Sequence, residues 1–395
     1  MFQKLHGLHS QLRNYSGLLI NCLILILLAG QAQAAVLEHT SQQQVLDWLT
    51  TYQPAAMAGN KKLSFPAFMD ELDQNRVIFV GEIHDRYDHH LTQLAILQAL
   101  HHKNPRLAIG VEWFQQSFQP VINEFLAGKI DEKELLRRTE YFDRWRYDYR
   151  MLRPILEYAK ANHLPVMALN APSELTRKIS KGGLQALTPQ ERAQLPTTIN
   201  PPDEAYRSRL EKVFAQHANG QSQFDNFMLV QRVWDETMAQ NINRFLQPNP
   251  DWRMIVFSGF GHIIHGDGIP KDMASHNPNL KIATVLSSDA RDIQADMVNY
   301  FVLTDPLSLP PTGKLGVWLQ PVDKGVKIGE MTEDSAAHKA GLQPGDRLVS
   351  LEGIHVTNMA DLMLALGEHK PGQKVKIDIE RQGKNGLLTK QVTLQ

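Results

Sequence analysis

The stretch Val77-Ile78-Phe79-Val80-Gly81-Glu82-Ile83-His84-Asp85 decides the fold of this chain. Its first four residues are β-branched or aromatic and a glycine follows them, which is typical of a buried strand near the centre of a parallel sheet. Two carboxylates and a histidine come directly after the strand. Because ligands of open α/β sheets bind beyond the carboxyl ends of the strands, these side chains lie where chemistry is expected.

Four further apolar runs have the character of strands: residues 107–111, 165–169, 254–257 and 282–286. Helical patterns separate them, including a long amphipathic helix over residues 224–245. Strands that alternate with helices require right-handed crossovers. The sequence therefore predicts an α/β fold with a largely parallel sheet flanked by helices.

The chain has 395 residues, which is enough for two domains. We expect a signal peptide over residues 1–34, an α/β domain over 35–303, a linker with three prolines over 304–312, and a small β-rich domain over 313–395. The formal net charge of -1 argues against a nucleic-acid partner, since nucleic-acid binders carry a basic surplus.

The amino-terminal region has the pattern of a secretory signal peptide. Lys4 and Arg13 precede an apolar run at residues 18–28, and Ala32-Gln33-Ala34 follows as a cleavage site. The run is short for a transmembrane helix, although an uncleaved anchor is the alternative. Cys22 lies inside the run and not at its end, as it would in a lipoprotein. We expect a soluble periplasmic protein whose mature chain, after cleavage, lacks cysteine and therefore has no disulfides or thiolate metal sites.

Polar residues follow several of the expected strands: Glu82, His84, Glu112, Asn170 and His262. Two histidines with one carboxylate are a common ligand set for Zn, Mn or Fe(II), and a bound water could be activated for hydrolysis. His84, Glu112 and His262 are the candidate metal ligands, and Glu82 and Glu112 the candidate catalytic carboxylates. The alternative is that these acids and histidines only pair with one another and cap helices.

The adjacent histidines of the next helical segment carry less weight. His89 and His90, like His101 and His102, are expected at the solvated surface, since paired histidines at a helix end are more often exposed than ligating.

Several separated stretches, in this order, carry a resemblance: Val80-Gly81-Glu82-Ile83-His84-Asp85, Gly110-Val111-Glu112, Pro165-Val166-Met167-Ala168-Leu169-Asn170-Ala171-Pro172, Trp234-Asp235-Glu236-Thr237-Met238-Ala239, Ser258-Gly259-Phe260-Gly261-His262 and Gly266-Asp267-Gly268-Ile269-Pro270. Through them, residues 62–300 resemble the ChaN-like haem-binding family, part of the Tiki/TraB and erythromycin-esterase superfamily. The family resemblance implies a bacterial protein that binds haem through tyrosine and serves iron acquisition. The superfamily resemblance implies a metal site at His84, Glu112 and His262.

A haem site needs an apolar slot, an axial ligand and basic groups for the propionates, and tyrosine oxygen is a known axial ligand. The candidate haem-binding residues are Tyr87, Tyr141, Tyr147 and Tyr149. Three of them lie in the aromatic and arginine-rich stretch 141–150. The alternative for that stretch is an amphipathic helix with its aromatic residues in the core and its arginines at the rim.

The stretch Ser335-Ala336-Ala337-His338-Lys339-Ala340-Gly341-Leu342-Gln343-Pro344-Gly345-Asp346 resembles a PDZ domain of the bacterial protease-associated type. The resemblance implies that Leu315, Gly316 and Val317 belong to a loop whose amides capture the carboxylate of a protein C-terminus. The helix at 358–366 would form the other wall of the groove. The alternative is a PDZ fold that only packs on its neighbour.

Two functions follow from these features. The first is a periplasmic haem- or iron-binding protein of the ChaN-like type, involved in iron acquisition, whose PDZ module engages a protein partner; a homodimer is left open. The second is a metal-dependent hydrolase or peptidase that uses the site with two histidines and one glutamate.

Overall fold

The computed structural model describes residues 56–59, 61–215, 221–289, 294, 296–323 and 325–395. The expected signal peptide lies outside the described residues. Within them, no helix combines the length and the apolar character that crossing a lipid bilayer requires.

The first sheet of the described chain has the strand order β2-β1-β8-β7-β3-β6-β4-β5. Its strands are β1 (Ala56–Ala58), β2 (Lys61–Leu63), β3 (Val77–Glu82), β4 (Leu107–Gln115), β5 (Val166–Asn170), β6 (Arg253–Gly259), β7 (Ile282–Ser288) and β8 (Tyr300–Leu303). From β8 to β5 every neighbouring pair is parallel, whereas β1 is antiparallel to both β2 and β8. The predicted mostly parallel sheet is confirmed, and the five predicted runs are five of its strands.

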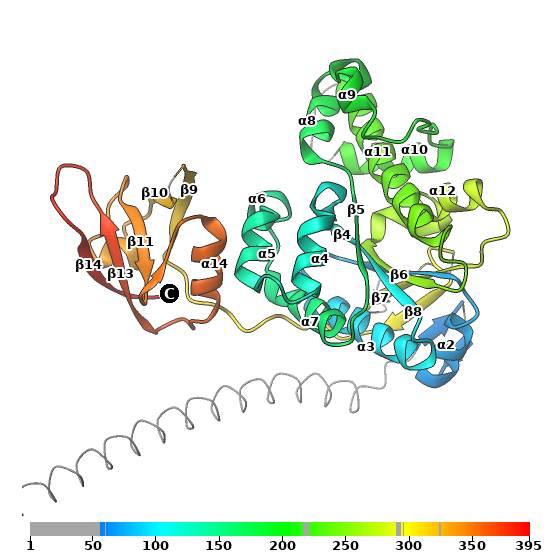
Figure 1. Ribbon diagram of the computed structural model, residues 1–395, viewed down its shortest axis with the longest axis horizontal. Coiled ribbons are helices and arrows are strands. Elements are labelled where there is room, and N and C mark those ends of the chain that lie inside the picture. The colour runs from blue at the N-terminus through cyan, green and yellow to red at the C-terminus, as the bar shows by residue number, and fades with distance from the viewer. Residues whose placement is uncertain (1–55, 60, 216–220, 290–293, 295, 324) are drawn as a thin grey trace, which may run out of the picture. The chain divides into compact units, whose positions relative to one another are not determined.

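Helices connect these strands (Figure 1). They are α2 (Phe65–Leu72), α3 (Tyr87–Lys103), α4 (Gln119–Leu126), α5 (Glu132–Arg138), α6 (Tyr141–Arg144), α7 (Arg153–Ala161), α8 (Ser173–Gly182), α9 (Pro189–Arg192), α10 (Glu204–Phe214), α11 (Gln221–Leu246) and α12 (Ile269–His276). Met238 and Ile242 of α11 pack with Phe79 and Val256 of the sheet in one buried cluster. The apolar stripe of the long predicted helix is therefore core, and it fixes α11 over β3 and β6.

The end of β3 is covered by the chain that leaves β6. A short 3-10 turn, Phe260–His262, follows β6 directly. A Cβ atom on Gly81 would lie 2.7 Å from Cδ1 of Ile263 and 3.3 Å from Cα of Phe260. Glycine at position 81 thus permits the close approach that brings His262 to the end of β3.

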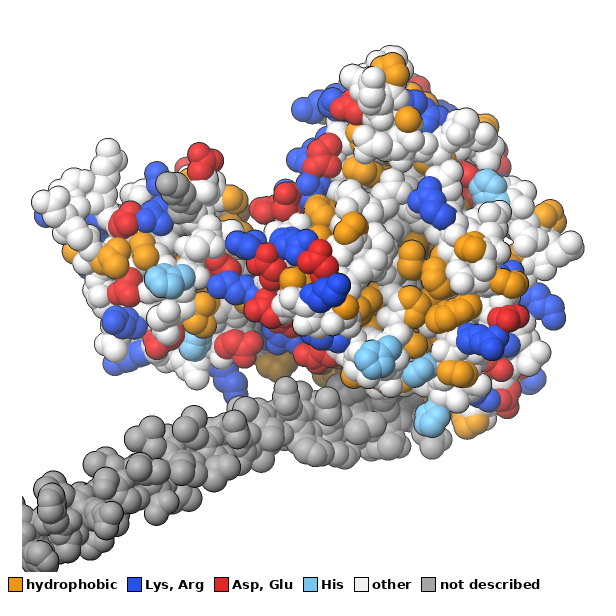
Figure 2. Space-filling model, viewed as in Figure 1, with side chains coloured by type: hydrophobic (Ala, Val, Ile, Leu, Met, Phe, Trp, Pro, Cys, Tyr) orange, Lys and Arg blue, Asp and Glu red, His pale blue; other side chains and the backbone are white. Residues whose placement is uncertain are grey.

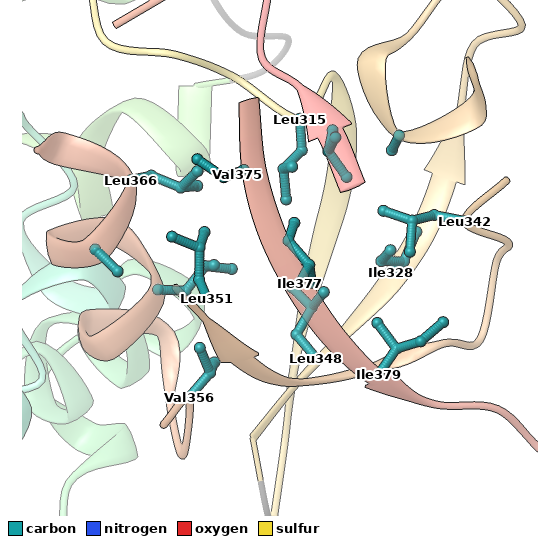
Figure 3. Close-up of a cluster of buried hydrophobic side chains, with 14 of the residues drawn as sticks. Leu315, Ile328, Leu342, Leu348, Leu351, Val356, Leu366, Val375, Ile377 and Ile379 are labelled. Atoms are coloured by element: carbon teal, nitrogen blue, oxygen red, sulfur yellow. The ribbon is translucent and has the colours of Figure 1, made fainter. Parts of the chain in front are cut away.

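A second sheet follows with the order β14-β13-β11-β10-β9, and β12 pairs with β11. Its strands are β9 (Val317–Val322), β10 (Gly325–Met331), β11 (Arg347–Leu351), β12 (Ile354–His355), β13 (Lys374–Glu380) and β14 (Leu388–Thr393), with the helices α13 (Ala336–Lys339) and α14 (Met359–Gly367). All its pairings are antiparallel. Figure 3 shows its core, where Leu315, Ile328, Leu348, Leu366 and Ile377 converge. The predicted β-rich second module is confirmed.

Charges of both signs are interspersed on the face of the molecule seen in Figure 2. This agrees with the formal net charge of -1. A mixed surface of this kind produces no long-range field of one sign on that face.

Candidate functional site

Glu82 ends β3 with its carboxylate fully buried and hydrogen-bonded on both oxygens. Its Oε1 lies 2.9 Å from Nδ1 of His84 and accepts from Nε1 of Trp113 at 3.3 Å. Its Oε2 accepts from Nε2 of Gln93 at 2.6 Å. Burial would raise the pKa of Glu82, but the histidines His90 and His84 outweigh it and lower the pKa. Glu82 is therefore an anion that orients His84.

His89 and His90 are buried, each with 1% of the side chain exposed, so the expectation of a solvated surface was wrong. Nε2 of His90 donates to the carbonyl oxygen of His84 at 3.1 Å, and Nδ1 of His89 accepts from the amide of Ile83 at 3.1 Å. Burial lowers the pKa of His89 to about 4, which keeps it neutral. The start of α3 lies beneath the turn at residues 83–85, and both histidines hold that turn in place.

His262 lies between two carboxylates. Its Nδ1 is 2.6 Å from Oδ1 of Asp235, and its Nε2 is 3.4 Å from Oε1 of Glu112. Burial alone would lower the pKa of His262, but the charge of Glu112 and the hydrogen bond to Asp235 raise it to about 10. Burial would raise the pKa of Glu112, whereas His262 lowers it to about 2. The two residues form a buried ion pair at neutral pH.

Asp235 is held in turn by Tyr206 of α10 and Arg232 of α11. Its Oδ2 accepts from the hydroxyl of Tyr206 at 2.6 Å and from Nη1 of Arg232 at 3.2 Å. Nη2 of Arg232 also donates to Oδ1 of Asp272 at 2.6 Å. Sequence reasoning gave these residues no role. The only signal was the stretch at 234–239, which carried the family resemblance and contains Asp235.

The structure brings the predicted residues His84, Glu112 and His262 close together. A Cβ atom on Gly259 would lie 3.0 Å from Nε2 of His84 and 3.6 Å from Oε2 of Glu112. The amide of Gly259 donates to Oε2 of Glu112 at 2.7 Å. Burial opposes protonation of His84, but Glu82 and Glu112 raise its pKa. Asn170 binds the backbone of the site, since its Nδ2 donates to the backbone oxygen of Glu112 at 3.1 Å.

Across the described residues, no group of three or more His, Cys, Asp or Glu side chains has an arrangement that could hold a metal ion. The donor types suit a divalent ion, but Glu112 is engaged by the amide of Gly259 and by His262. A histidine ligand must be neutral, whereas the pKa of His262 is raised to about 10. As arranged here, the predicted ligands form ion pairs, and metal binding by them stays a prediction.

The four candidate tyrosines lie in different surroundings. Tyr141 and Tyr149 are in the core, and their buried hydroxyls have no hydrogen-bond partner among the described residues. Tyr87, the first residue of α3, is half-buried. The ring of Tyr147 is also half-buried, and its centroid lies 5.0 Å from that of His84. Stretch 141–150 is not one amphipathic helix, since α6 ends at Arg144 and Arg146 has a φ of +71°.

Two aromatic rings lie against His84, and exposed apolar residues lie next to the site in the chain. The Trp145 ring lies 4.8 Å from the His84 ring. Ile83 is 42% exposed and Phe260 is 37% exposed. We call Ile83, His84, Trp145, Tyr147 and Phe260 the His84 face. Large apolar groups are exposed here beside a buried charged cluster, which is typical of a ligand site.

The predicted carboxylate loop of the second module contains a glycine in the left-handed region. Gly316 has a φ of +71°, which favours glycine. Leu315 is buried in the core, and its carbonyl oxygen accepts from the amide of Ala337 at 3.0 Å. Val317 begins β9, which lies at the edge of the sheet. Capture of a peptide at this loop stays a prediction.

The chain was compared with known proteins. Residues 68–273 match the family model described as haem-binding uptake, Tiki superfamily, ChaN, and residues 313–392 match the PDZ domain model. A solved structure, of cofacial haem binding to ChaN of Campylobacter jejuni, aligns with 63% of this chain and 96% of that chain at 17% identity, with a TM-score of 0.52. At this identity the likeness shows the fold alone.

Curated relatives match over shorter segments. A probable periplasmic serine endoprotease DegP-like of Ectopseudomonas mendocina is 37% identical over 83 residues, which are 18% of each chain. The regulator of sigma-E protease RseP of Escherichia coli is 29% identical over 122 residues, 30% of this chain and 25% of the relative. The chain thus spans about a fifth of the length of the curated relatives that it matches first. Because the haem-binding uptake model covers more than half of the sequence and the fold agrees with it, this chain belongs to the ChaN family of the Tiki superfamily and carries a PDZ domain after its ChaN domain.

Proposed function

We propose that this protein binds haem on the His84 face, with Tyr147 as the axial ligand, and serves iron acquisition in the periplasm. The position of Tyr147 is the observation that carries the proposal. Of the four candidate tyrosines, Tyr141 and Tyr149 are enclosed in the core, whereas Tyr147 lies against His84 among exposed apolar groups. An axial ligand must be reachable from the surface, and an apolar rim must accompany it.

The groups beside Tyr147 suit the rest of the ligand. Trp145, whose ring centroid lies 5.5 Å from that of Tyr147, offers an aromatic surface for the macrocycle. Arg146 lies between them in the chain and is exposed. Its guanidinium is the nearest in sequence that could pair with a propionate, since Arg144 is already engaged by Glu140 and Glu174.

Tyrosine binds ferric haem through its phenolate, so the protonation of Tyr147 matters. Burial raises the pKa of Tyr147, and the nearby carboxylates of Asp85 and Glu112 raise it further. The phenolate therefore forms when the iron compensates its charge. Binding then releases a proton, and the affinity for haem should increase with pH.

A hemin titration of the purified protein, followed by visible absorbance, tests this proposal. We expect a saturable Soret shift that Tyr147→Phe weakens at least tenfold in affinity. Tyr87→Phe is the control, because Tyr87 is the other candidate tyrosine that the core does not enclose. An unchanged titration of Tyr147→Phe would rule out this ligand.

The cellular part of the proposal is supported by the signal-peptide pattern and by the uptake function of the family. We propose that residues 1–34 direct the chain to the periplasm. Fractionation of cells that produce the protein, with immunoblotting for a chain shortened by about the length of the signal peptide, tests the location. Growth of a deletion strain on haem as the iron source tests the role.

The name of the Campylobacter jejuni relative, cofacial haem binding, supports a related proposal. Two copies of this chain would bring their His84 faces together around haem, which would cover the exposed Ile83 and Phe260. Sedimentation with and without hemin tests it. A monomer in both conditions would argue against a haem-bridged homodimer.

For the PDZ domain we propose capture of a partner's C-terminus beside β9, with the amides of the loop at 315–317 as carboxylate donors. Among the described residues, the amides of Leu315 and Gly316 donate to no backbone carbonyl outside the helices and strands. Binding of peptides with a free C-terminus, compared with the same peptides after amidation, tests carboxylate capture. Equal affinity would contradict it.

One observation supports a second function, a metal-dependent hydrolase or peptidase. His84 and His262, which follow β3 and β6, both approach Glu112 of β4. If a Zn, Mn or Fe ion replaced the ion pair, His84, Glu112 and His262 would hold it. Glu82 would orient His84 and would be the candidate general base. Elemental analysis of the parent, His84→Ala and His262→Ala tests this function. Equal metal content in all three would contradict it.

A further inference from the structure

The PDZ domain exposes a tryptophan on its edge strand. Trp318 of β9 is 75% exposed, although tryptophan is highly buried in most proteins. Its neighbours in the strand, Val317 and Leu319, pack against the core of the domain. Since side chains alternate along a strand, Trp318 and Gln320 point to the opposite face.

The edge of β9 is available for an added strand. In the part of the chain that the structure describes, β9 pairs with β10 and is the last strand of its sheet. The proposed carboxylate loop lies directly before β9, so a captured C-terminus sits at the start of the strand. The peptide must then run antiparallel to β9, with its last residue beside Val317 and its penultimate residue beside Trp318.

Strand alternation divides the peptide into two sets of side chains. The last residue and the third from the end face the same side as Val317 and Leu319, where the surroundings are apolar. The penultimate residue and the fourth from the end face the side of Trp318 and Gln320. Trp318 therefore meets the penultimate side chain.

An acidic residue lies across the strand pair from Trp318. Val317 pairs with Met331 and Leu319 with Ile328, so Trp318 lies opposite the bulge formed by Gly329 and Glu330. Glu330 is exposed. Glu333 and Asp334 are exposed in the turn that ends at Ser335, whose Cβ would lie 2.8 Å from a Cβ on Gly316. At the next position of β9 on the same face, the neighbouring charge is positive, because Lys327 lies opposite Gln320.

We propose that the PDZ domain selects protein C-termini with an arginine at the penultimate position, and that Trp318 is the residue that determines this specificity. A guanidinium stacks on an indole face by a cation–π interaction, and Glu330 adds a favourable charge. Lysine can meet the same charge but stacks less well. The inference rests on the proposed capture of a C-terminus and adds the chemical class of the partner.

Two labelled peptides of identical composition test the inference by fluorescence anisotropy with the purified protein. Both end in valine. One has arginine at the penultimate position and glutamate at the fourth from the end, and the other has these two residues exchanged. We expect the first to bind at least fivefold more tightly, and the preference to decrease at high salt as far as Glu330 and Lys327 contribute to it.

Variants of Trp318 test whether this side chain itself sets the preference between the two peptides. Trp318→Ala should reduce the preference to below twofold, while Trp318→Phe keeps part of it. Leu387→Ala is the control, because Leu387 is 54% exposed and lies beside β14 at the opposite edge of the sheet. It should leave both affinities unchanged.

The outcomes are distinguishable. If neither peptide binds the parent protein, the proposed capture of a C-terminus fails. If both bind equally, capture holds and the selection of arginine is wrong. If Trp318→Ala leaves the preference intact, the inference is overturned, and a change in sedimentation would then show that Trp318 serves contact between copies of the chain.

Discussion

Nδ1 of His262 lies 2.6 Å from Oδ1 of Asp235, and the opposite ring nitrogen faces Glu112. An imidazole between two carboxylates is stabilised as the imidazolium, which is why the pKa of His262 is raised to about 10. The arrangement orients the ring and leaves Glu112 as the acceptor for the amide of Gly259. The stability of the ChaN domain should therefore depend on pH through this pair.

The first prediction concerns that dependence. Since the pKa of His262 rises from 6.5 to about 10, its contribution is complete below pH 6.5 and is lost as the pH rises through 10. The pKa of Glu112 falls from 4.5 to about 2, so its contribution is complete above pH 4.5 and is lost as the pH falls through 2. Both contribute fully between pH 4.5 and 6.5.

Glu112→Gln should lower the free energy of unfolding by about 3 kcal/mol at pH 5.5, because it leaves a buried charge without one partner. The difference from the parent should narrow toward pH 10, where His262 loses its proton in the folded state. Urea unfolding at both pH values measures it. A difference that does not change with pH would mean that the two residues are not an ion pair.

The second prediction concerns the space around His84. In Gly259→Ala, the new Cβ would lie 2.8 Å from Cε1 of His84, so the ring must move or the strand end must shift. We expect a loss of about 1–3 kcal/mol of stability and weaker hemin binding. Gly261→Ala is the matched control, since no atom lies within 4 Å of its Cβ position. Equal effects of both variants would show that the contact with His84 does not matter.

Much of the fold could be predicted from the sequence because the strands of this sheet are buried on both faces. A run such as Val77-Ile78-Phe79-Val80 has no polar alternation, and every residue of β3 is buried. The site residues at the strand ends could be predicted for the same reason. The carboxyl ends of parallel strands lie at one edge, so Glu82, Glu112 and His262 were expected along it, and the adjacent order β3-β6-β4 brings them together.

The rest of the site depends on helix packing, which has no local pattern in the sequence. Asp235 reaches His262 from α11, which packs on the sheet, and Tyr206 reaches Asp235 from α10. The burial of His89 and His90 was also missed. Their polarity suggested the surface, whereas both ring nitrogens of His90 and Nδ1 of His89 form hydrogen bonds when buried.

The third prediction concerns Tyr141, one of the two candidate tyrosines in the core. The hydroxyl of Tyr141 is buried without a hydrogen-bond partner among the described residues. Tyr141→Phe removes a polar group that is costly to bury, so we expect stability to stay equal or to increase by about 1 kcal/mol. The Soret band with hemin should not change. A weakened Soret band would show that Tyr141 reaches the haem and that the core opens to admit it.

The fourth prediction concerns the carboxylate loop. Gly316 has a φ of +71°, and a Cβ there would lie 2.6 Å from Nε2 of Gln395 and 2.8 Å from Cβ of Ser335. Gly316→Ala should therefore destabilise the domain and displace the amides that would capture a peptide carboxylate. Gly353→Ala is the matched control, because Gly353 has a φ of +80° but no atom within 4 Å of its Cβ position.

In both variants an alanine must adopt a left-handed backbone conformation, which costs about 1–2 kcal/mol. This part of the loss of stability is the same for both. Only Gly316→Ala adds the steric conflict at the loop. We expect it to reduce the affinity for a free C-terminal peptide at least tenfold, measured by anisotropy at a temperature where both variants are folded, while Gly353→Ala binds as the parent does. If the two variants bound the peptide equally well, the carboxylate would be held elsewhere along β9, since displacing these amides would then cost nothing.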